Sequence, residues 1–247
     1  MQIIQSKKIS SYSNLIFGMS TRNGGVSPEK YGLNMSFTVG DEQKNVEENR
    51  RRFFSGLEIS QSQIAFPIQN HTTNICSVNS AGEYKNTDAL ITNTKNLFLA
   101  ISVADCNAVM LFDSVTQTIA GVHAGWRGTV GKIVSQTIEM MEKQYFINPK
   151  NLIAFIGPSA RKCCYEVEKD VAQEFSSKFL KERSDDKFLL DVPSANVEQL
   201  VESGVLENNI EIHPDCTICS SKTYHSYRCD KEKAGRMLAV IGMKVDK

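Results

Sequence analysis

Three apolar segments dominate the middle of the chain, and each is rich in residues that favour strands. They span residues 98–103, 108–112 and 118–123, and each has the length of a strand rather than of a helix. Asp113 and Ser114 supply turn chemistry between the last two segments, which predicts a β-hairpin. Cys106 then lies in a break between strands and His123 at the end of one, where functional side chains are commonly held on a rigid scaffold.

A helix is predicted immediately after this hairpin, over residues 129–146. Its apolar residues recur at roughly helical spacing: Val130, Ile133, Val134, Ile138 and Met141. Thr129 is a suitable N-cap for it. The glycine-flanked turn at residues 125–128 therefore leads into a helix N-terminus, which carries free N–H groups and partial positive charge. Arg127 in that turn adds a planar cation, so we expect an anion site beside His123.

The rest of the chain alternates between predicted helices and strands. A step of four residues between Val167, Val171, Phe175 and Phe179 predicts an amphipathic helix over residues 166–180. Further helices are expected over 45–54 and over 194–203 (with Ser194 as cap and Gly204 past its end), and strands over 151–156, 210–212 and 239–245. Because the hairpin argues against a purely parallel sheet, we expect an α/β or α+β fold with mixed sheets. The absence of repeats and linkers predicts one domain over residues 1–247.

Composition narrows the functional classes. The chain has 28 basic and 28 acidic residues, so nothing indicates a nucleic-acid footprint. No apolar run approaches the ~20 residues of a membrane helix, and residues 1–10 lack a signal-peptide core. Seven cysteines, an odd number without framework spacing, fit reduced thiols. We therefore expect a cytoplasmic protein without a nucleic-acid or membrane partner.

Two of the four histidines form a constellation with a cysteine: His71, Cys106 and His123. Imidazole and thiolate suit zinc, and three protein ligands leave a fourth position for water or substrate, as in catalytic sites. The wide separations, 35 residues from 71 to 106 and 17 from 106 to 123, differ from the close pairs of zinc fingers. The folded domain must therefore assemble this site.

The same residue types allow two other chemistries. Cys106 and His123 could act as nucleophile and base in a thiol hydrolase. Two histidines, a cysteine and a weak methionine, for which Met110 is available, also make a blue-copper set. A multicopper oxidase needs many further histidines, however, and only His213 and His225 remain. Zinc is therefore preferred to copper.

Six segments carry a family resemblance. They are Thr21-Arg22-Asn23-Gly24-Gly25-Val26-Ser27, Ala104-Asp105-Cys106, Gly121-Val122-His123-Ala124-Gly125-Trp126-Arg127-Gly128, Ile156-Gly157-Pro158, Cys164-Tyr165-Glu166-Val167 and Ser226-Tyr227-Arg228. The chain resembles, throughout its length, the laccase-domain family, whose members are variously called purine nucleoside phosphorylase, polyphenol oxidase or peptidoglycan editing factor. The resemblance implies a layered α/β/β/α arrangement with mixed sheets, similar at fold level to toxin deamidases.

The resemblance also implies a function. Residues matching His71, Cys106 and His123 bind zinc in that family, and the implied activity is phosphorolysis of purine nucleosides to free base and ribose 1-phosphate. Adenosine deamination and methylthioadenosine phosphorolysis are possible additional activities. The expected partners are thus a purine nucleoside and phosphate.

Further residues in the matched motifs receive expected roles. Arg127, and after it Arg22 and Arg228, are candidate holders of phosphate or ribose. Asp105 could orient His71 or His123, or else cap a turn. Asp88 could act as a general acid or base, or close a turn. Trp126 or Tyr227 could stack on a purine.

Departures from the family pattern leave alternative functions open. Asn70, Thr72, Ala108 and Cys229 stand where the family usually has other residues, and the last change removes a cation that could bind substrate. The alternatives are a hydrolase that edits peptidoglycan precursors and a binding protein with structural zinc. In the latter, His213 or His225 would supply a fourth ligand.

Five of the other six cysteines form a second group in the sequence: Cys163, Cys164, Cys216, Cys219 and Cys229. The Cys216-x-x-Cys219 spacing is compatible with redox chemistry or zinc ligation. A four-cysteine site is possible, but nothing in the sequence fixes the pairing. The preferred expectation is that these thiols are buried or idle.

Overall fold

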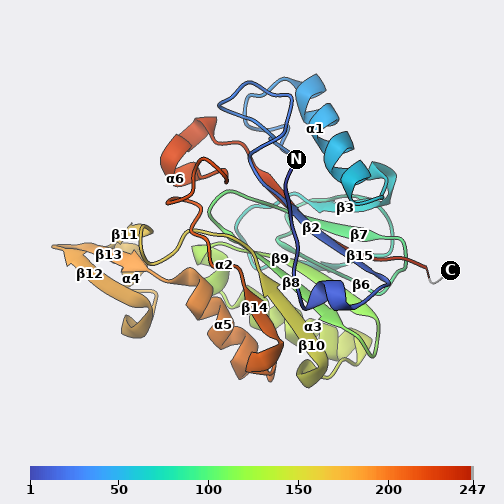
Figure 1. The fold of residues 1–247 in the computed structure, drawn as a ribbon. Helices are drawn as coiled ribbons and strands as arrows, with labels where there is room; N and C mark the ends of the chain where they lie inside the picture. Colours follow the sequence, from blue (N-terminus) through green and yellow to red (C-terminus); the bar gives the residue numbers. More distant parts are fainter. Residues whose placement is uncertain (246–247) are drawn as a thin grey trace.

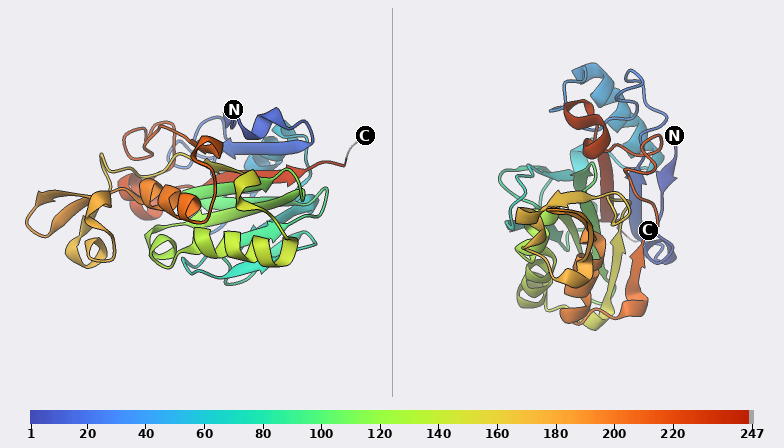
Figure 2. Two further views of the ribbon diagram at one scale, coloured as in Figure 1. Left: turned by 90° about the horizontal axis from the view of Figure 1, so that it is seen from below. Right: turned by 90° about the vertical axis from the view of Figure 1, so that its left-hand side faces the viewer.

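Alternate residues of the central strands face two different layers, and this pattern organises the molecule. In the computed structural model, which describes residues 1–245, two six-stranded sheets pack face to face. Leu99 and Ile101 point into the core between the sheets, whereas Phe98 and Ala100 point outward. In the second sheet Met110 faces the same core and Val109 faces outward. Figure 2 shows the two sheets stacked, in its left-hand view.

The first sheet has the strand order β1-β2-β15-β7-β3-β5. Its strands are β1 (Ile3–Ile4), β2 (Leu15–Ser20), β3 (Ile64–Pro67), β5 (Gly82–Tyr84), β7 (Phe98–Val103) and β15 (Met237–Met243). Strand β3 pairs in parallel with both β5 and β7, and the other pairs are antiparallel. The sheet is therefore mixed.

The second sheet has the strand order β14-β10-β8-β9-β6-β4. Its strands are β4 (Ile75–Ser77), β6 (Ala89–Thr92), β8 (Asn107–Asp113), β9 (Thr118–Ala124), β10 (Leu152–Ile156) and β14 (Ile210–Ile212). Strands β8 and β9 form the predicted hairpin. The pairs β10–β14 and β4–β6 are parallel and the rest antiparallel.

Helices cover the outer face of each sheet. Helix α1 (Gln43–Gly56) packs Phe53 and Phe54 against the first sheet. Helices α3 (Ile133–Tyr145) and α5 (Val192–Glu202) cover the second. Figure 1 shows α1 on the opposite side of the sheets from α3 and α5. The expected α/β/β/α layering with mixed sheets is confirmed.

A third, smaller sheet projects from this body. It consists of β11 (Glu166–Glu168), β13 (Lys187–Leu190) and β12 (Leu180–Ser184), with the short helix α4 (Lys169–Ala172) beside them (Figure 1). The predicted helix over residues 166–180 is therefore wrong. Its apolar residues, spaced by four, lie instead on a strand, on one helical turn and in a loop. They pack together in a separate small core around Leu190.

Two other predicted helices exist but differ in extent from the prediction. The helix expected over 129–146 is split into α2 (Trp126–Val130) and α3, because Lys132 adopts a left-handed conformation with φ of 59°. Thr129 lies inside α2 rather than at its cap. The helix expected to begin at Ser194 begins at Val192. Its N-cap is Asp191, whose side chain accepts a hydrogen bond from the Ser194 N–H.

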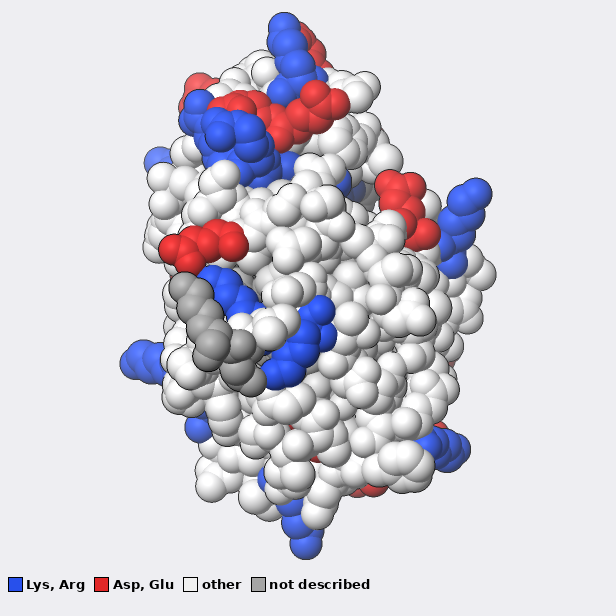
Figure 3. Space-filling view, turned by 90° about the vertical axis from the view of Figure 1, so that its right-hand side faces the viewer, with Lys and Arg blue, Asp and Glu red and all other residues white. Residues whose placement is uncertain are grey.

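Neither sign of charge dominates the face in Figure 3, where basic and acidic groups lie next to each other around a broad uncharged area. Some of the opposite charges are paired, as where Glu48 of α1 bridges Arg51 and Arg52. No helix among residues 1–245 is long and apolar enough to cross a membrane.

Candidate metal centre and active site

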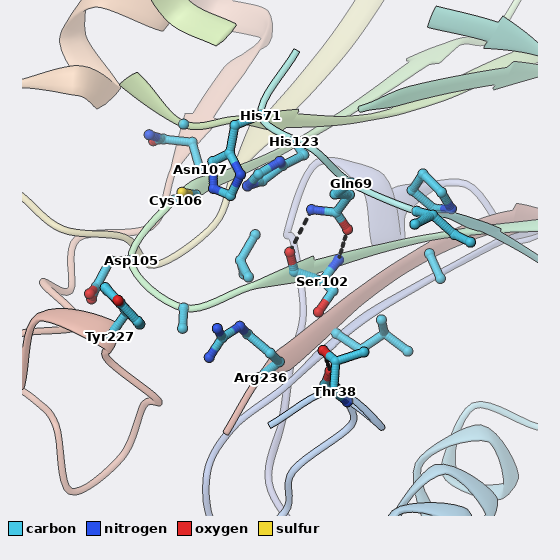
Figure 4. Close-up of a pocket in the computed structure, with 18 of the residues that line it drawn as sticks. Thr38, Gln69, His71, Ser102, Asp105, Cys106, Asn107, His123, Tyr227 and Arg236 are labelled. Carbon is cyan, nitrogen blue, oxygen red and sulfur yellow. Dashed lines mark hydrogen bonds between the residues drawn. The ribbon is translucent and has the colours of Figure 1, made fainter. Parts of the chain in front are cut away.

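The predicted metal donors meet beside the segment that crosses from the first sheet to the second. They are His71, Cys106 and His123. Cys106 lies in the link from β7 of the first sheet to β8 of the second, and His123 lies opposite Ala108 in the β8–β9 hairpin. His71 comes from the loop between β3 and β4. The donor atoms of the three side chains lie within 4.8 Å of one another, and Figure 4 shows them on one wall of a cavity. The fold thus assembles the group that the sequence predicted.

A buried carboxylate sets the orientation of this group. Asp88, which is fully buried just before β6 (Ala89–Thr92), lies with Oδ1 2.8 Å from Nδ1 of His123. The same carboxylate accepts hydrogen bonds from the backbone N–H groups of His71 (3.0 Å) and Thr72 (2.8 Å). Because an ionised carboxylate only accepts, Nδ1 of His123 carries the proton, and its Nε2 is free to coordinate.

The electrostatics of Asp88 agree with this role. Burial opposes its ionisation, but the hydrogen bonds from His123 and Thr72 outweigh burial and lower the pKa of Asp88 to about 2. His71 adopts a left-handed backbone conformation, with φ of 59°. A non-glycine residue holds this conformation only where its surroundings enforce it. The Asp88 hydrogen bonds provide that constraint.

This geometry corrects two expected roles. Asp105 does not orient either histidine: it accepts hydrogen bonds from Oγ1 of Thr217 (2.6 Å) and the backbone N–H of Arg228 (2.7 Å). It thereby holds the start of α6 (Tyr227–Asp230) against the link that carries Cys106. Asp88 takes the orienting role, and it is not among the residues that line the cavity. The expected role of Asp88 as a general acid or base therefore has no support from its position.

Cys106 and His123 shift each other's protonation. Burial disfavours the Cys106 thiolate, but the neighbouring His123 charge and hydrogen bonds from both histidines lower its pKa below the ordinary value. Burial likewise disfavours protonated His123, whereas the Cys106 thiolate and Asp88 raise its pKa. The site therefore stabilises a thiolate, which is the form that both a metal and a nucleophilic mechanism require.

The cavity in front of these residues has a volume of about 830 Å³. Its lining includes the expected Trp126, Arg127, Tyr227 and Arg228. The Arg127 guanidinium lies 4.2 Å from the centre of the Trp126 ring, and that of Arg228 lies 4.6 Å from the centre of the Tyr165 ring. The wall thus combines cations with aromatic faces.

Arg22 is another expected site residue that does not line the cavity. Its guanidinium forms an ion pair of 2.8 Å with Asp230 and donates to the carbonyls of Ser221 and Lys30. Asp230 is the last residue of α6. Arg22 therefore supports α6 from outside the cavity.

Several lining residues were missed by the sequence reasoning. Arg50 of α1 and Arg236, which precedes β15, reach the cavity from outside the recognised motifs. Gln69 exchanges two hydrogen bonds of 2.8 Å with the backbone of Ser102 (Figure 4), which ties the His71 loop to β7. No local pattern marks these residues, because only the folded sheets bring them together.

The remaining candidate ligands lie elsewhere. Among residues 1–245, no fourth His, Cys, Asp or Glu joins the group of His71, Cys106 and His123. His213 accepts a hydrogen bond from the Asp215 backbone, and His225 is fully buried without a hydrogen-bond partner. Met110 packs in the core between the sheets. In the described part of the chain, neither the fourth ligand of a structural zinc site nor further histidines for a copper cluster lie at this centre.

Comparison with known proteins agrees with the motifs. Residues 16–244 match the model of a family described as multi-copper polyphenol oxidoreductase laccase. The chain belongs to this family. It is 31% identical to a purine nucleoside phosphorylase of Bacteroides thetaiotaomicron over 95% of this chain and 94% of that protein. It is also 31% identical to purine nucleoside phosphorylase YlmD of Bacillus subtilis, over 93% of this chain and 89% of that protein.

A solved structure shows the same fold. The hypothetical protein YfiH of Bacillus licheniformis superposes with a TM-score of 0.92 at 31% identity. The match covers 96% of this chain and 95% of that one. The family membership thus rests on the sequence matches, and the layered fold is shared with a solved structure.

The different roles of Asp88 and Asp105 predict different phenotypes. Asp88→Asn removes the charge that orients His123, and loss of such a partner typically weakens metal affinity by about 10- to 100-fold. Asp105→Asn leaves the histidines in place, so the metal affinity should stay within about threefold of wild type. Competition with a chromophoric chelator measures both affinities. Weakened affinity in Asp105→Asn alone would contradict the assignment.

Proposed function

We propose that this protein is a zinc-dependent purine nucleoside phosphorylase, which converts a purine nucleoside and phosphate into the free base and ribose 1-phosphate. The observation that carries the proposal is the position of a three-donor metal group in a cavity lined with cations and aromatic rings. The names of the curated relatives support the reaction class.

Zinc fits the donor set better than copper does. Two imidazoles and one thiolate are borderline-soft ligands, and a three-ligand site within an open cavity is typical of catalytic zinc. When bound, zinc would polarise an oxygen of phosphate or of a substrate hydroxyl, or lower the pKa of water. His71, Cys106 and His123 would hold it, with Asp88 fixing the His123 tautomer.

The phosphate is assigned to the cations of the cavity. Among residues 1–245, no carboxylate lies within ion-pair distance of the guanidinium groups of Arg127, Arg228 or Arg236, all of which line the cavity. Guanidinium groups bind phosphate oxygens through two parallel hydrogen bonds. Arg127 is the preferred holder, because it lies directly after Trp126 at the beginning of α2, beside the end of β9 that carries His123.

The nucleoside is assigned to the aromatic faces. Trp126, Tyr165 and Tyr227 line the cavity and can stack on a purine. In the proposed reaction, a phosphate oxygen forms a bond to C1′ of the ribose while the bond from C1′ to the base nitrogen breaks. The base leaves with the bonding electrons and takes up a proton. The role of the protein is to hold the two reactants in line and to exclude water.

Adenosine deamination is a second activity that the same centre could support. Water would add at C6 of the purine and the amino group would leave as ammonia, which gives inosine. We also propose that the enzyme acts in the cytoplasm. The seven free thiols within residues 1–245 support a reducing compartment, and the balanced charge favours a small-molecule partner over nucleic acid.

Product analysis tests the proposed reaction. Protein of known zinc content is incubated with inosine and with adenosine, each with and without phosphate, and the base, ribose 1-phosphate and ammonia are quantified. We expect base and ribose 1-phosphate in equal amounts, only with phosphate, at rates that follow the zinc content. Base release that is independent of phosphate, or full activity of metal-free protein, would contradict the proposal.

The Arg127 assignment predicts a specific kinetic defect. A hydrogen bond to a charged group contributes about 1.5–3 kcal/mol, so Arg127→Ala should raise KM for phosphate by about tenfold or more. KM for the nucleoside should change less. Arg183→Ala, at an exposed ion pair with Glu166 on the small sheet, is the control and should behave as wild type. A larger defect in nucleoside KM than in phosphate KM would refute the assignment.

A further inference from the structure

Four cysteines from two distant loops meet outside the candidate active site. Cys163 and Cys164 precede β11, and Cys216 and Cys219 lie in the segment between β14 and α6. All four sulfur atoms lie within 4.8 Å of one another. Sγ of Cys219 is 2.9 Å from Sγ of Cys164 and 3.5 Å from Sγ of Cys163. The structure thus supplies the grouping that the sequence left open, and excludes Cys229 from it.

These distances suit a shared metal ion rather than disulfides. A disulfide bond is about 2.05 Å long, which is shorter than either sulfur–sulfur distance. Four thiolates that surround Zn²⁺ tetrahedrally at about 2.3 Å lie about 3.8 Å apart. The observed separations therefore need only small side-chain adjustments to reach this geometry. Tetrahedral sites of four sulfur ligands select zinc or iron among the common metals.

The backbone around Cys216 is already arranged for a thiolate. Cys216 is buried, and Ser220 N–H donates to its carbonyl oxygen at 3.0 Å, which closes a turn around the C-x-x-C segment. Backbone N–H groups of Cys219, Arg161 and Ile218 hydrogen-bond its sulfur. Such N–H groups stabilise the charge of a metal-bound sulfur.

The two loops are also joined by the backbone. Ser159 and Cys216 form a parallel β-bridge, and Thr217 N–H donates to the Ser159 carbonyl at 3.0 Å. Each loop therefore contributes two cysteines to a cluster whose backbone positions are fixed. This is a closed set of four protein ligands, which is typical of structural zinc rather than of catalytic zinc.

We propose that Cys163, Cys164, Cys216 and Cys219 bind one Zn²⁺ as a structural site, separate from the centre at His71, Cys106 and His123. The site cross-links the loop that carries Tyr165, part of one wall of the active-site cavity, to the segment that carries Thr217. Tyr165, next to Cys164, carries the Arg228 guanidinium on its ring, and Thr217, next to Cys216, holds Asp105. The bound ion stabilises this wall, and the proposal does not depend on the phosphorylase activity.

Metal stoichiometry in a set of variants tests the proposal. Protein purified under reducing conditions is loaded with Zn²⁺, passed through a desalting column and analysed for metal per chain. We expect two zinc ions in wild type, one in Cys106→Ala, one in Cys219→Ser and none in the double variant. Cys163→Ser serves as a second variant of the cluster in case Cys219→Ser does not fold. Cys229→Ser is the matched control and should retain two ions.

Cobalt gives an independent readout of the ligands. In the Cys106→Ala background, bound Co²⁺ should show the intense charge-transfer absorption of a tetrathiolate site, and Cys219→Ser should abolish it. Absence of zinc from Cys106→Ala, or unchanged stoichiometry in the cluster variants, would overturn the proposal. Iron in place of zinc after expression with both metals would overturn the choice of ion. Thiol counting that finds Cys163, Cys164, Cys216 and Cys219 in two disulfides would replace the metal site with a redox site.

Discussion

Asp88 is a fully buried carboxylate that hydrogen-bonds the side chain of one metal-donor residue and the backbone of another. Removal of such a group would leave an imidazole N–H and several backbone N–H groups without partners, and each buried unsatisfied group costs about 1–3 kcal/mol. One interaction therefore fixes the tautomer of His123 and the strained backbone of His71 together. The direction of both histidines toward Cys106 follows from it.

The position of the centre follows from the fold. Because β7 and β8 belong to different sheets, the chain between them must cross from one sheet to the other, and this crossing carries Asp105 and Cys106. Asp105 then fastens α6 to the crossing through the Arg228 N–H. The metal donors consequently lie on one wall of the cavity, and Arg50 of α1 and residues of several loops contribute to the other walls. The crossing between the two sheets thus provides the binding cavity without a further structural unit.

The sequence predicted the central strands and the metal donors for a physical reason. Buried strands such as Phe98–Val103 are apolar on both faces, and this signal survives without tertiary information. Cys106 and His123 belong to recognisable motifs, and His71 matches a family position although its neighbours Asn70 and Thr72 depart from the pattern. The grouping of the three donors was therefore predicted by resemblance although they are far apart in the sequence. Local patterns thus sufficed where the element was buried on all sides or the motif was specific.

Predictions failed where distant contacts decide the structure. The apolar residues from Val167 to Phe179 recur every four positions, as in a helix, yet Val167 lies in a strand and pairs with Phe188. The sequence left Asp105 either to orient a histidine or to cap a turn, and the structure places it at the start of α6, whereas Asp88 orients His123. Sequence adjacency to Cys106 says nothing about the direction of a side chain. Arg50 and Arg236 gave no signal at all, since each reaches the cavity from an element that only the folded sheets place there.

The most direct test of the central claim is a crystal structure of the zinc-loaded protein, with anomalous data recorded on both sides of the zinc absorption edge. We expect an anomalous peak for a zinc ion that is coordinated by His71, Cys106 and Nε2 of His123. Nδ1 of His123 should donate a hydrogen bond to Asp88, and the fourth coordination position should be open to the cavity. A fourth protein ligand at this position, or the absence of zinc between these three residues, would contradict an open catalytic centre.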